Sequence, residues 1–441
     1  MPPSAAKPVP FREALAAWTR IGCASFGGPA AQIALMHRVA VEEKRWLDEP
    51  RFLHALNFCM LLPGPEAQQL ATYIGWLLHG IRGGLAAGLL FILPGAVVIA
   101  AFAAVYVLYG RLPAVEAAFL GVKAAVLALV VEALLRIAGR ALRDRFAWGL
   151  ACSAFAALFL FDAPFPAVIA AAALLGGGRV LLGGRSGQSV ESDMPLCPSG
   201  SATTRHGTGR LAFILLAIWL LPTGLLLAWL GGGHVFSIIA VFFSKMAVLT
   251  FGGAYAVLSW VAQEAVAARG WLSPGEMLDA LGLAETTPGP LILVVEFVGF
   301  LAAWREAGGL DPLVAGLLGA ALTLWVTFAP CFLFIFAGAP HVERMRGRPG
   351  LQAALAGVTA AVVGVIANLS AWFALNLLFA EGGRIAPGPV SVYLPDPASL
   401  DSKALVLAGI AALALFVLRL GAFRTLALAA LAGLALFAVG A

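Results

Sequence analysis

The sequence has few charged residues. Asp, Glu, Lys and Arg make up 12% of its 441 residues, against 61% for hydrophobic residues, and the mean hydropathy is +0.94. Soluble proteins carry roughly twice that share of charge, so an ordinary soluble enzyme or binding domain is excluded. The formal net charge of +5 comes without any dense basic tract, so we expect no nucleic-acid partner.

Cysteine and histidine are also sparse and scattered. The five cysteines lie far apart without a CxxC pair, and no two of the six histidines are four residues apart. This pattern excludes a disulfide framework and makes haem or zinc unexpected, so we predict no cofactor and no metal. The start of the chain, MPPSAAKPVP, lacks the short apolar run and cleavage site of a signal peptide, and we expect it to be retained.

Long apolar segments are abundant. Thirteen candidates lie at about 11–36, 52–80, 85–109, 114–135, 146–161, 164–182, 211–230, 235–262, 277–304, 312–338, 351–379, 403–419 and 422–440. Their length favours spanning helices over barrel strands. We predict an all-α, polytopic integral membrane protein with about 13 membrane segments, within a range of 10–13. Residues 183–209 are rich in Ser, Gly and Thr and predict a flexible linker between halves 1–182 and 210–441.

The two halves repeat one another. At an offset of 225 positions and without a gap, Phe26-Gly27-Gly28 aligns with Phe251-Gly252-Gly253, Trp46-Leu47 with Trp271-Leu272, and Pro63-Gly64-Pro65 with Pro288-Gly289-Pro290. At an offset of 236, Gly121-Val122 aligns with Gly357-Val358. Single matches are common in so biased a composition, but several multi-residue matches are not. We infer an internal duplication.

The duplication predicts an inverted topology. Seven segments separate the starts of the two repeats, and an odd number inverts the second repeat in the membrane. The positions of arginines agree with the positive-inside rule. One cluster follows the fourth segment: Arg136, Arg140, Arg143 and Arg145. In the second repeat a cluster precedes the equivalent segment: Arg344, Arg346 and Arg348. The basic loop 37–51 does not follow this rule, because the topology places it on the external side. It leaves open a re-entrant hairpin at 52–80.

Glycine and proline interrupt the apolar segments at equivalent positions. The tracts "SFGGP" at 25–29 and "TFGGA" at 250–254, like the two Pro-Gly-Pro tracts, are poor helix material. A bilayer tolerates such breaks only where protein or an aqueous cavity covers them, so we expect them inside, facing each other. Broken helices in inverted repeats are typical of secondary transporters, and half-helix N-termini bind anions. The alternative is that the glycines only allow close helix packing.

Two cations aligned by the repeat are candidates for an anion site. Arg20 and Lys245 each lie six residues before their glycine pair. A cation inside an apolar segment costs about 2.5–3.5 kcal/mol on insertion scales and usually marks function, and two cations suit a doubly charged anion. The alternative is that they snorkel to an interface. Lys123, inside GVKAAVLALVVEALLR, is a further candidate, with a partner elsewhere in the bundle equally open.

Acidic and neutral polar side chains beside the breaks complete the candidate site. Glu66 follows the first Pro-Gly-Pro and Glu285 precedes the second; either is a candidate to couple a proton, and Glu66 is equally a candidate helix cap. The predicted substrate-binding residues are Arg20, Phe26, Gly27, Gly28, Pro63, Gly64, Pro65, Glu66, Gln69, Lys123, Lys245, Phe251, Gly252, Gly253, Glu285, Pro288, Gly289 and Pro290.

These tracts resemble the chromate ion transporter family in its long, two-domain form. The resemblance covers both repeats and rests on Phe26-Gly27-Gly28-Pro29, Arg45-Trp46-Leu47, LLPGPEAQQLATYIGW at 61–76, GVKAAV at 121–126, KMAVLTFGGAYAVL at 245–258 and ETTPGPLILVVEFVGF at 285–300. The second repeat departs from the first, because Ala254 replaces Pro29 and Leu291 replaces Glu66. A mechanism that uses both glutamate positions symmetrically is therefore in doubt.

The resemblance implies a multi-pass protein of the bacterial cytoplasmic (inner) membrane that exports chromate and so confers chromate resistance. The membrane potential or an ion gradient, such as a proton gradient, would drive it. Sulfate has the same shape and charge and is the expected competitor or alternative substrate; a homodimer stays open. A passive anion channel would have the same cradle. An intramembrane enzyme would need a nucleophile–base pair or a metal cluster, which we do not find in the sequence, so we expect no enzyme.

Overall fold

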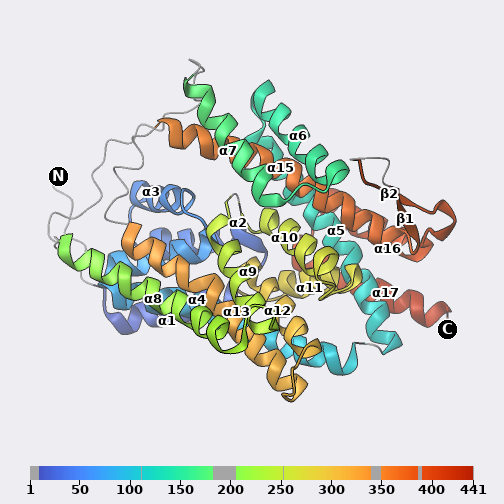
Figure 1. The fold of residues 1–441 in the computed structure, drawn as a ribbon, viewed down its shortest axis with the longest axis horizontal. Helices are drawn as coiled ribbons and strands as arrows, with labels where there is room; N and C mark the ends of the chain where they lie inside the picture. The colour runs from blue at the N-terminus through green and yellow to red at the C-terminus, as the bar shows by residue number, and fades with distance from the viewer. Residues whose placement is uncertain are drawn as a thin grey trace.

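Two bundles of helices make up the structure, a computed structural model that describes residues 9–110, 112–181, 205–251, 253–338, 349–385 and 390–440 (Figure 1). The broken-helix bundle consists of α1 (Phe11–Ala24), α2 (Gly28–His37), α3 (Glu49–Cys59), α4 (Glu66–Tyr109), α8 (Arg205–Leu230), α9 (Val235–Leu249), α10 (Ala254–Ala262), α11 (Pro274–Thr286), α12 (Val294–Arg305) and α13 (Pro312–Gly338). The long-helix bundle consists of α5 (Pro113–Ala141), α6 (Arg145–Phe161), α7 (Phe165–Leu181), α15 (Pro349–Leu378), α16 (Ser402–Ala412) and α17 (Ala422–Gly440).

In the long-helix bundle, helices from each half of the chain pack against a helix from the other half. Helices α6 and α7 pack against α15, whereas α16 and α17 pack against α5. Small residues permit the close approach: a β-carbon on Gly121 would lie 1.9 Å from the carbonyl oxygen of Ala429, and one on Gly357 would lie 2.5 Å from that of Ala172. These equivalent crossings tie the two halves together.

Short elements follow the repeat as well. The π-helical turns η1 (Arg38–Glu43) and η2 (Gln263–Ala268) occupy equivalent positions. After each turn the backbone N–H of a tryptophan donates to an equivalent backbone carbonyl at 2.7 Å, Trp46 to Ala40 and Trp271 to Ala265. The remaining short elements are η3 (Leu291–Leu293), η5 (Pro397–Ser399), η6 (Leu413–Val417) and an antiparallel hairpin of β1 (Gly382–Ile385) and β2 (Val392–Pro395), with Gly382 opposite Pro395.

Side-chain caps begin several helices. Asp48 accepts from the backbone of Arg51 at the start of α3, and at the equivalent position Ser273 forms a capping box with Glu276 at the start of α11. Such caps satisfy backbone N–H groups that have no partner within the helix. Asp144 caps α6; the Ala147 N–H and then the Arg179 guanidinium, 2.5 Å away, hold the pKa of its carboxyl below its usual range.

Six of the described helices are long and apolar enough to cross a membrane alone: α4, α5, α8, α13, α15 and α17. Helix α4 bends into a hairpin at His79 and Gly80, whose dihedral angles are not helical. The 11 residues of α3 extend about 16 Å at 1.5 Å per residue, roughly half of a hydrocarbon core of about 30 Å. The all-α, polytopic prediction is therefore confirmed, whereas thirteen full crossings are not established.

Some expectations lie outside the described residues. They concern Gly252, the linker up to residue 204, and the second arginine cluster, Arg344, Arg346 and Arg348. The last residues of the expected linker, 205–209, form the start of α8 instead.

The two repeats differ in how they meet the long-helix bundle. Helices α10 and α11 of the second repeat pack against α15, and α11 also packs against α5 and α17. The equivalent surface of the first repeat is open: Leu53 of α3 is 46% exposed and Met60 is 50% exposed. Their equivalents on α11, Leu278 and Glu285, are 1% and 5% exposed. The broken-helix bundle therefore packs against the long-helix bundle mainly through its second repeat.

Candidate functional site

The two kinds of break dock onto each other reciprocally. The backbone N–H of Gly64, in the first Pro-Gly-Pro, donates to the carbonyl of Thr250, which precedes the second Phe-Gly-Gly, at 2.9 Å. The N–H of Gly289, in the second Pro-Gly-Pro, donates to the carbonyl of Ser25, which precedes the first, at 2.8 Å. Reciprocal contacts of this kind are the signature of a twofold relation. The breaks of the two repeats thus face each other, as the sequence predicts.

Glycine is required in these breaks because the backbone adopts left-handed angles. The φ angles are +85° at Gly27, +77° at Gly28 and +98° at Gly253, a region in which side chains are strained. At the two tips, Gly64 has φ +121° and Gly289 has φ +98°. The sequence pattern of the breaks therefore follows from the backbone path.

Long helices cover each tip at equivalent points. A β-carbon on Gly95 of α4 would lie 2.0 Å from the carbonyl oxygen of Pro288, and Cys331 of α13, its equivalent, lies against Gly64. The Gln32 amide of α2 also donates to the Gly289 carbonyl at 2.6 Å. The tips are therefore enclosed by protein, which meets the requirement for non-helical backbone in a membrane.

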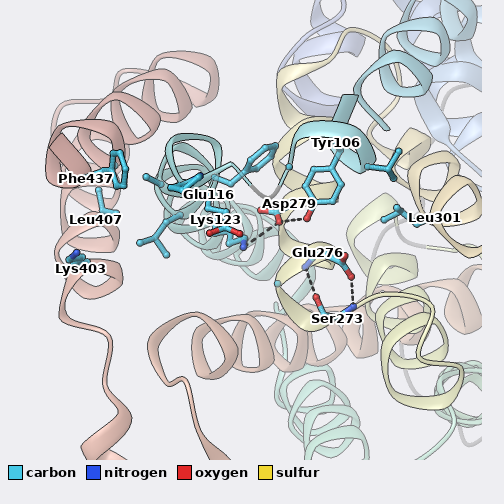
Figure 2. Close-up of a pocket in the computed structure, with 18 of the residues that line it drawn as sticks. Tyr106, Glu116, Lys123, Ser273, Glu276, Asp279, Leu301, Lys403, Leu407 and Phe437 are labelled. Atoms are coloured by element: carbon cyan, nitrogen blue, oxygen red, sulfur yellow. Dashed lines mark hydrogen bonds and ion pairs between the residues drawn. The ribbon is translucent and has the colours of Figure 1, made fainter. Parts of the chain in front are cut away.

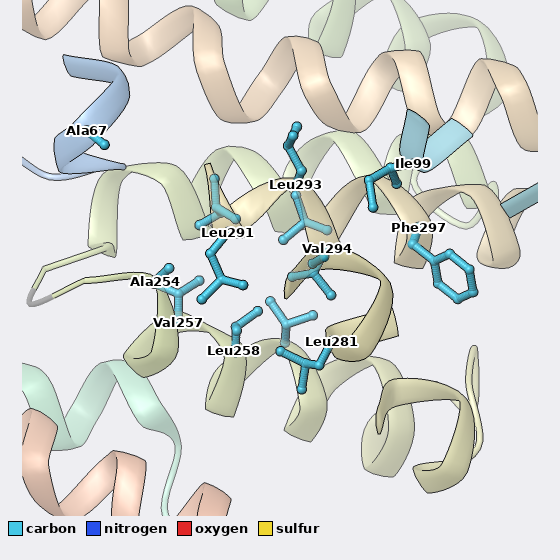
Figure 3. Close-up of a cluster of buried hydrophobic side chains, with 14 of the residues drawn as sticks. Ala67, Ile99, Ala254, Val257, Leu258, Leu281, Leu291, Leu293, Val294 and Phe297 are labelled. Carbon is cyan, nitrogen blue, oxygen red and sulfur yellow. The ribbon is translucent and has the colours of Figure 1, made fainter. Parts of the chain in front are cut away.

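The surroundings of the two tips differ in polarity. The first tip is followed by Glu66, which is half-buried at the start of α4, and by buried Gln68, Gln69 and Thr72. The Gln69 amide donates to the Pro63 carbonyl at 2.6 Å. The equivalent positions of the second tip carry only apolar residues, Leu291, Leu293, Val294 and Phe297, which form the buried cluster in Figure 3. Buried polar side chains flank the second tip at other positions, Glu285, Thr287 and Glu296, so the two tips differ in where their polar groups lie.

Several predicted site residues lie away from the tips. Arg20 and Lys245 are both exposed, and Arg20, with 61% of its side chain exposed, pairs with Glu43 at 2.8 Å. Their positions fit snorkelling cations better than a shared anion site. The Phe26 ring lies against Phe423 of α17, with centroids 6.4 Å apart.

Glu285 lies buried at the end of α11. It accepts a hydrogen bond from the Tyr255 hydroxyl at 2.5 Å. Phe251 is half-buried, and Pro65 and Pro290 are buried within the docked tips. The structure thus gathers the predicted tip residues and Glu285 in the interior.

Lys123 lies in a cavity of about 840 Å³ between the two bundles (Figure 2). Its ammonium is 3.3 Å from a carboxylate oxygen of Asp279 on α11, and the Tyr106 hydroxyl of α4 donates to the same oxygen at 2.8 Å. A second pair, Arg305 with Glu276 at 2.5 Å, also lines the cavity. The cavity at the boundary between the bundles is therefore lined by both signs of charge: Lys123, Arg305 and Lys403 beside Glu116, Glu276 and Asp279.

Sequence reasoning missed Asp279, Tyr106 and Arg305. Asp279 stands in the apolar run MLDALGLA before the second Pro-Gly-Pro, and its equivalent in the first repeat is His54, so the repeat did not mark it. An acid inside an apolar segment is itself a signal of function, and that signal was available. Among the described residues, no group of three or more His, Cys, Asp or Glu side chains is placed to hold a metal.

Together these features define a class of protein. Helices of membrane length, two repeats with broken helices that dock reciprocally, and a charged cavity between bundles are the features of a polytopic membrane transporter. The chain belongs to the chromate transporter family: the family's model matches residues 12–177 and again residues 237–436. The double match shows that the two halves are homologous.

The similarity to relatives extends over most of the chain. A chromate transport protein of Pseudomonas aeruginosa is 33% identical over 362 residues, covering 81% of this chain and 80% of the relative. One of Cupriavidus metallidurans is 28% identical over 362 residues, with the same coverage. An uncharacterized transporter of Methanocaldococcus jannaschii is 23% identical over 359 residues, covering 81% of this chain and 82% of the relative. No solved structure matches the chain significantly.

Replacing a tip glycine tests the reciprocal docking. Gly64→Ala places a β-carbon 2.7 Å from the Gln69 amide nitrogen, and Gly289→Ala places one 3.1 Å from Leu293, both at positive φ. Each change is expected to lower the free energy of unfolding by about 1–3 kcal/mol. Thermal unfolding of the detergent-solubilised protein measures the loss.

The matched control is Gly178→Ala in α7, where nothing lies within 4 Å of the added carbon. It is expected to leave stability unchanged or raise it by about 0.5–1 kcal/mol. Tip variants as stable as this control would contradict the docking role.

Proposed function

We propose that the protein is a secondary transporter that exports chromate across the bacterial cytoplasmic membrane and so confers chromate resistance. Family membership and similarity to two chromate transport proteins support the substrate. The observation that carries the transport site is the cavity between the bundles, because its cations Lys123, Arg305 and Lys403 suit a tetrahedral dianion. Sulfate, with equal charge and shape, is the proposed competitor.

The proposed mechanism is a rocking of the broken-helix bundle against the long-helix bundle. The two repeats, proposed to be inverted in the membrane, present equivalent surfaces, and here α10 and α11 of the second repeat provide most of the packing against the long-helix bundle. In the alternate state α2 and α3 take that place and α11 becomes exposed. Exchange of equivalent contacts opens the site to opposite sides in turn. The two repeats, residues 1–182 and 210–441, therefore form one complete transport unit within a single chain. A homodimer would contain two such units.

Chromate movement in oriented vesicles tests the function. Purified protein in vesicles is expected to accumulate chromate against its own gradient when a counter-gradient or potential is imposed, with competition by sulfate. Inside-out vesicles accumulate chromate if the protein exports it. Flux that only follows the chromate gradient would identify a passive channel and contradict a coupled carrier.

Lys123→Ala is expected to reduce chromate transport roughly 10- to 100-fold, because a hydrogen bond to a charged partner contributes about 1.5–3 kcal/mol. Arg20→Ala serves as the matched cation variant. Its ion pair is exposed and contributes about 0–1 kcal/mol, so transport falls less than about fivefold. Initial rates at equal protein content measure both, and the reverse order of effects would contradict the proposed site.

A crosslink tests the alternate state. In the structure Gly282 of α11 packs against Val122 of α5, so close that a β-carbon would lie 2.2 Å from a Val122 methyl. The repeat places Asn57 of α3 and Val358 of α15 at the equivalent positions. Asn57→Cys with Val358→Cys is expected to form a disulfide during turnover and to stop transport until reduction.

The background for this experiment replaces the exposed Cys23 and Cys152 by serine, and each single cysteine variant is the control. An active double variant that never crosslinks, with or without chromate, would refute the exchange of surfaces.

A further inference from the structure

Asp279 is a buried carboxylate with one unused oxygen. The side chain is 5% exposed, and the oxygen Oδ2 accepts from Tyr106 and pairs with Lys123. Among the described residues no donor reaches the other oxygen, Oδ1. Figure 2 shows Lys123 and Tyr106 approaching Asp279 from two sides of the cavity. A buried carboxylate in this position is stable as an anion only while its cation is in place.

The pair joins the two bundles. Asp279 lies on α11 of the broken-helix bundle and Lys123 on α5 of the long-helix bundle, so a separation of the bundles pulls them apart. The equivalent positions on α3 and α15 carry His54 and Thr359, which do not reproduce a carboxylate–ammonium pair. The alternate state therefore has no substitute for this contact.

Other charged groups around Asp279 do not replace Lys123. On its own helix Glu276 is engaged by Arg305 of α12. Glu116 of α5 and Lys403 of α16 also line the cavity, and Lys403 lies apart from Asp279 in Figure 2. Among described residues, α15 and α17 contribute no charged side chain to the cavity lining.

We propose that Asp279 carries the coupling proton: it binds one proton when Lys123 binds the transported oxyanion, and it releases that proton when it pairs with Lys123 again. The proposal rests on the proposed function. Lys123 has one strong partner at a time, either the substrate dianion or the Asp279 carboxylate. Proton and oxyanion are therefore bound together and released together, so one proton accompanies each anion in the same direction. No bond other than the O–H bond on Asp279 forms or breaks.

This assignment differs from the two glutamates that the sequence suggests. Glu285 accepts a hydrogen bond from Tyr255. Glu66 lies at the start of a helix, where its negative charge interacts favourably with the helix dipole. Neither has a Lys or Arg partner among the described ion pairs. Of these three acids, Asp279 alone pairs with a cation among the described residues, so it alone of the three loses a cation when an anion arrives, which links the two binding events.

Proteoliposomes loaded with chromate and an internal pH dye test the proposal, at an alkaline pH where chromate is the dianion. Outward chromate flux through the wild-type protein is expected to raise the internal pH. Asp279→Asn mimics the protonated acid, so it is expected to retain exchange of internal for external chromate while losing the chromate-driven pH change. Asp279→Glu restores a titratable group and is expected to recover the pH change.

Glu306→Gln is the control, because Glu306 is an exposed carboxylate at the end of α12 that is not part of the cavity lining. It is expected to keep both exchange and the pH change. A pH change that persists in Asp279→Asn would overturn the proposal, as would the loss of exchange in both Asp279 variants while they elute as folded protein. Tyr106→Phe gives a second readout that does not depend on Asp279→Asn folding. It removes a hydrogen bond to the carboxylate, and the pH dependence of coupled flux is expected to move to higher pH; an unchanged profile contradicts the proposal.

A failure of the proposed function has a different outcome. Wild-type protein that moves no chromate refutes chromate transport itself. Wild-type protein that moves chromate without any pH change refutes only the role of Asp279.

Discussion

A helix that breaks inside a membrane leaves backbone N–H and carbonyl groups without partners, and the rest of this structure follows from how those groups are satisfied. Each repeat breaks twice, and each break finds its partner in the other repeat. Gly64 donates to Thr250 and Gly289 donates to Ser25, at distances of ordinary hydrogen bonds. Because an unpaired polar group in hydrocarbon costs several kcal/mol, neither half satisfies its own breaks alone. The fold therefore requires both repeats, because each satisfies the backbone groups that the other leaves open.

The docked tips join the two repeats within the broken-helix bundle, and helices from both halves pack together in the long-helix bundle. Between these two bodies the contact is one-sided. Leu278 is buried while its equivalent Leu53 is exposed, although both stand at the same place in the repeat. Two equivalent surfaces that are used unequally are what the proposed rocking mechanism expects of one of its two states. The Lys123–Asp279 pair lies at the used surface, so closure of that surface and the charge of the cavity are linked.

The sequence predicted the breaks and their meeting because glycine and proline restrict the backbone in ways that no tertiary context removes. The repeat offset placed Ser25 with Thr250 and Gly64 with Gly289, and the structure pairs them across the halves. The structure places Arg20 and Lys245 on exposed faces, because the offset reports equivalent positions along the chain but not the side of the helix that faces inward. Asp279 was missed because its partner Lys123 lies on a distant helix, and only packing brings the two together. The polarity difference between the tips was visible at one position, Leu291 against Glu66, and the structure extends it to the neighbouring side chains.

The central claim is that equivalent surfaces of the two repeats exchange places against the long-helix bundle. Spin-label distances measured by double electron–electron resonance test it most directly, with one pair on Asn57 and Thr359, spanning α3 and α15, and another on Gly275 and Glu116, spanning α11 and α5. The account predicts two populations for each pair, which chromate shifts in opposite directions, so that one distance shortens as the other lengthens. Two distances that stay fixed, or that change in the same direction, would contradict it.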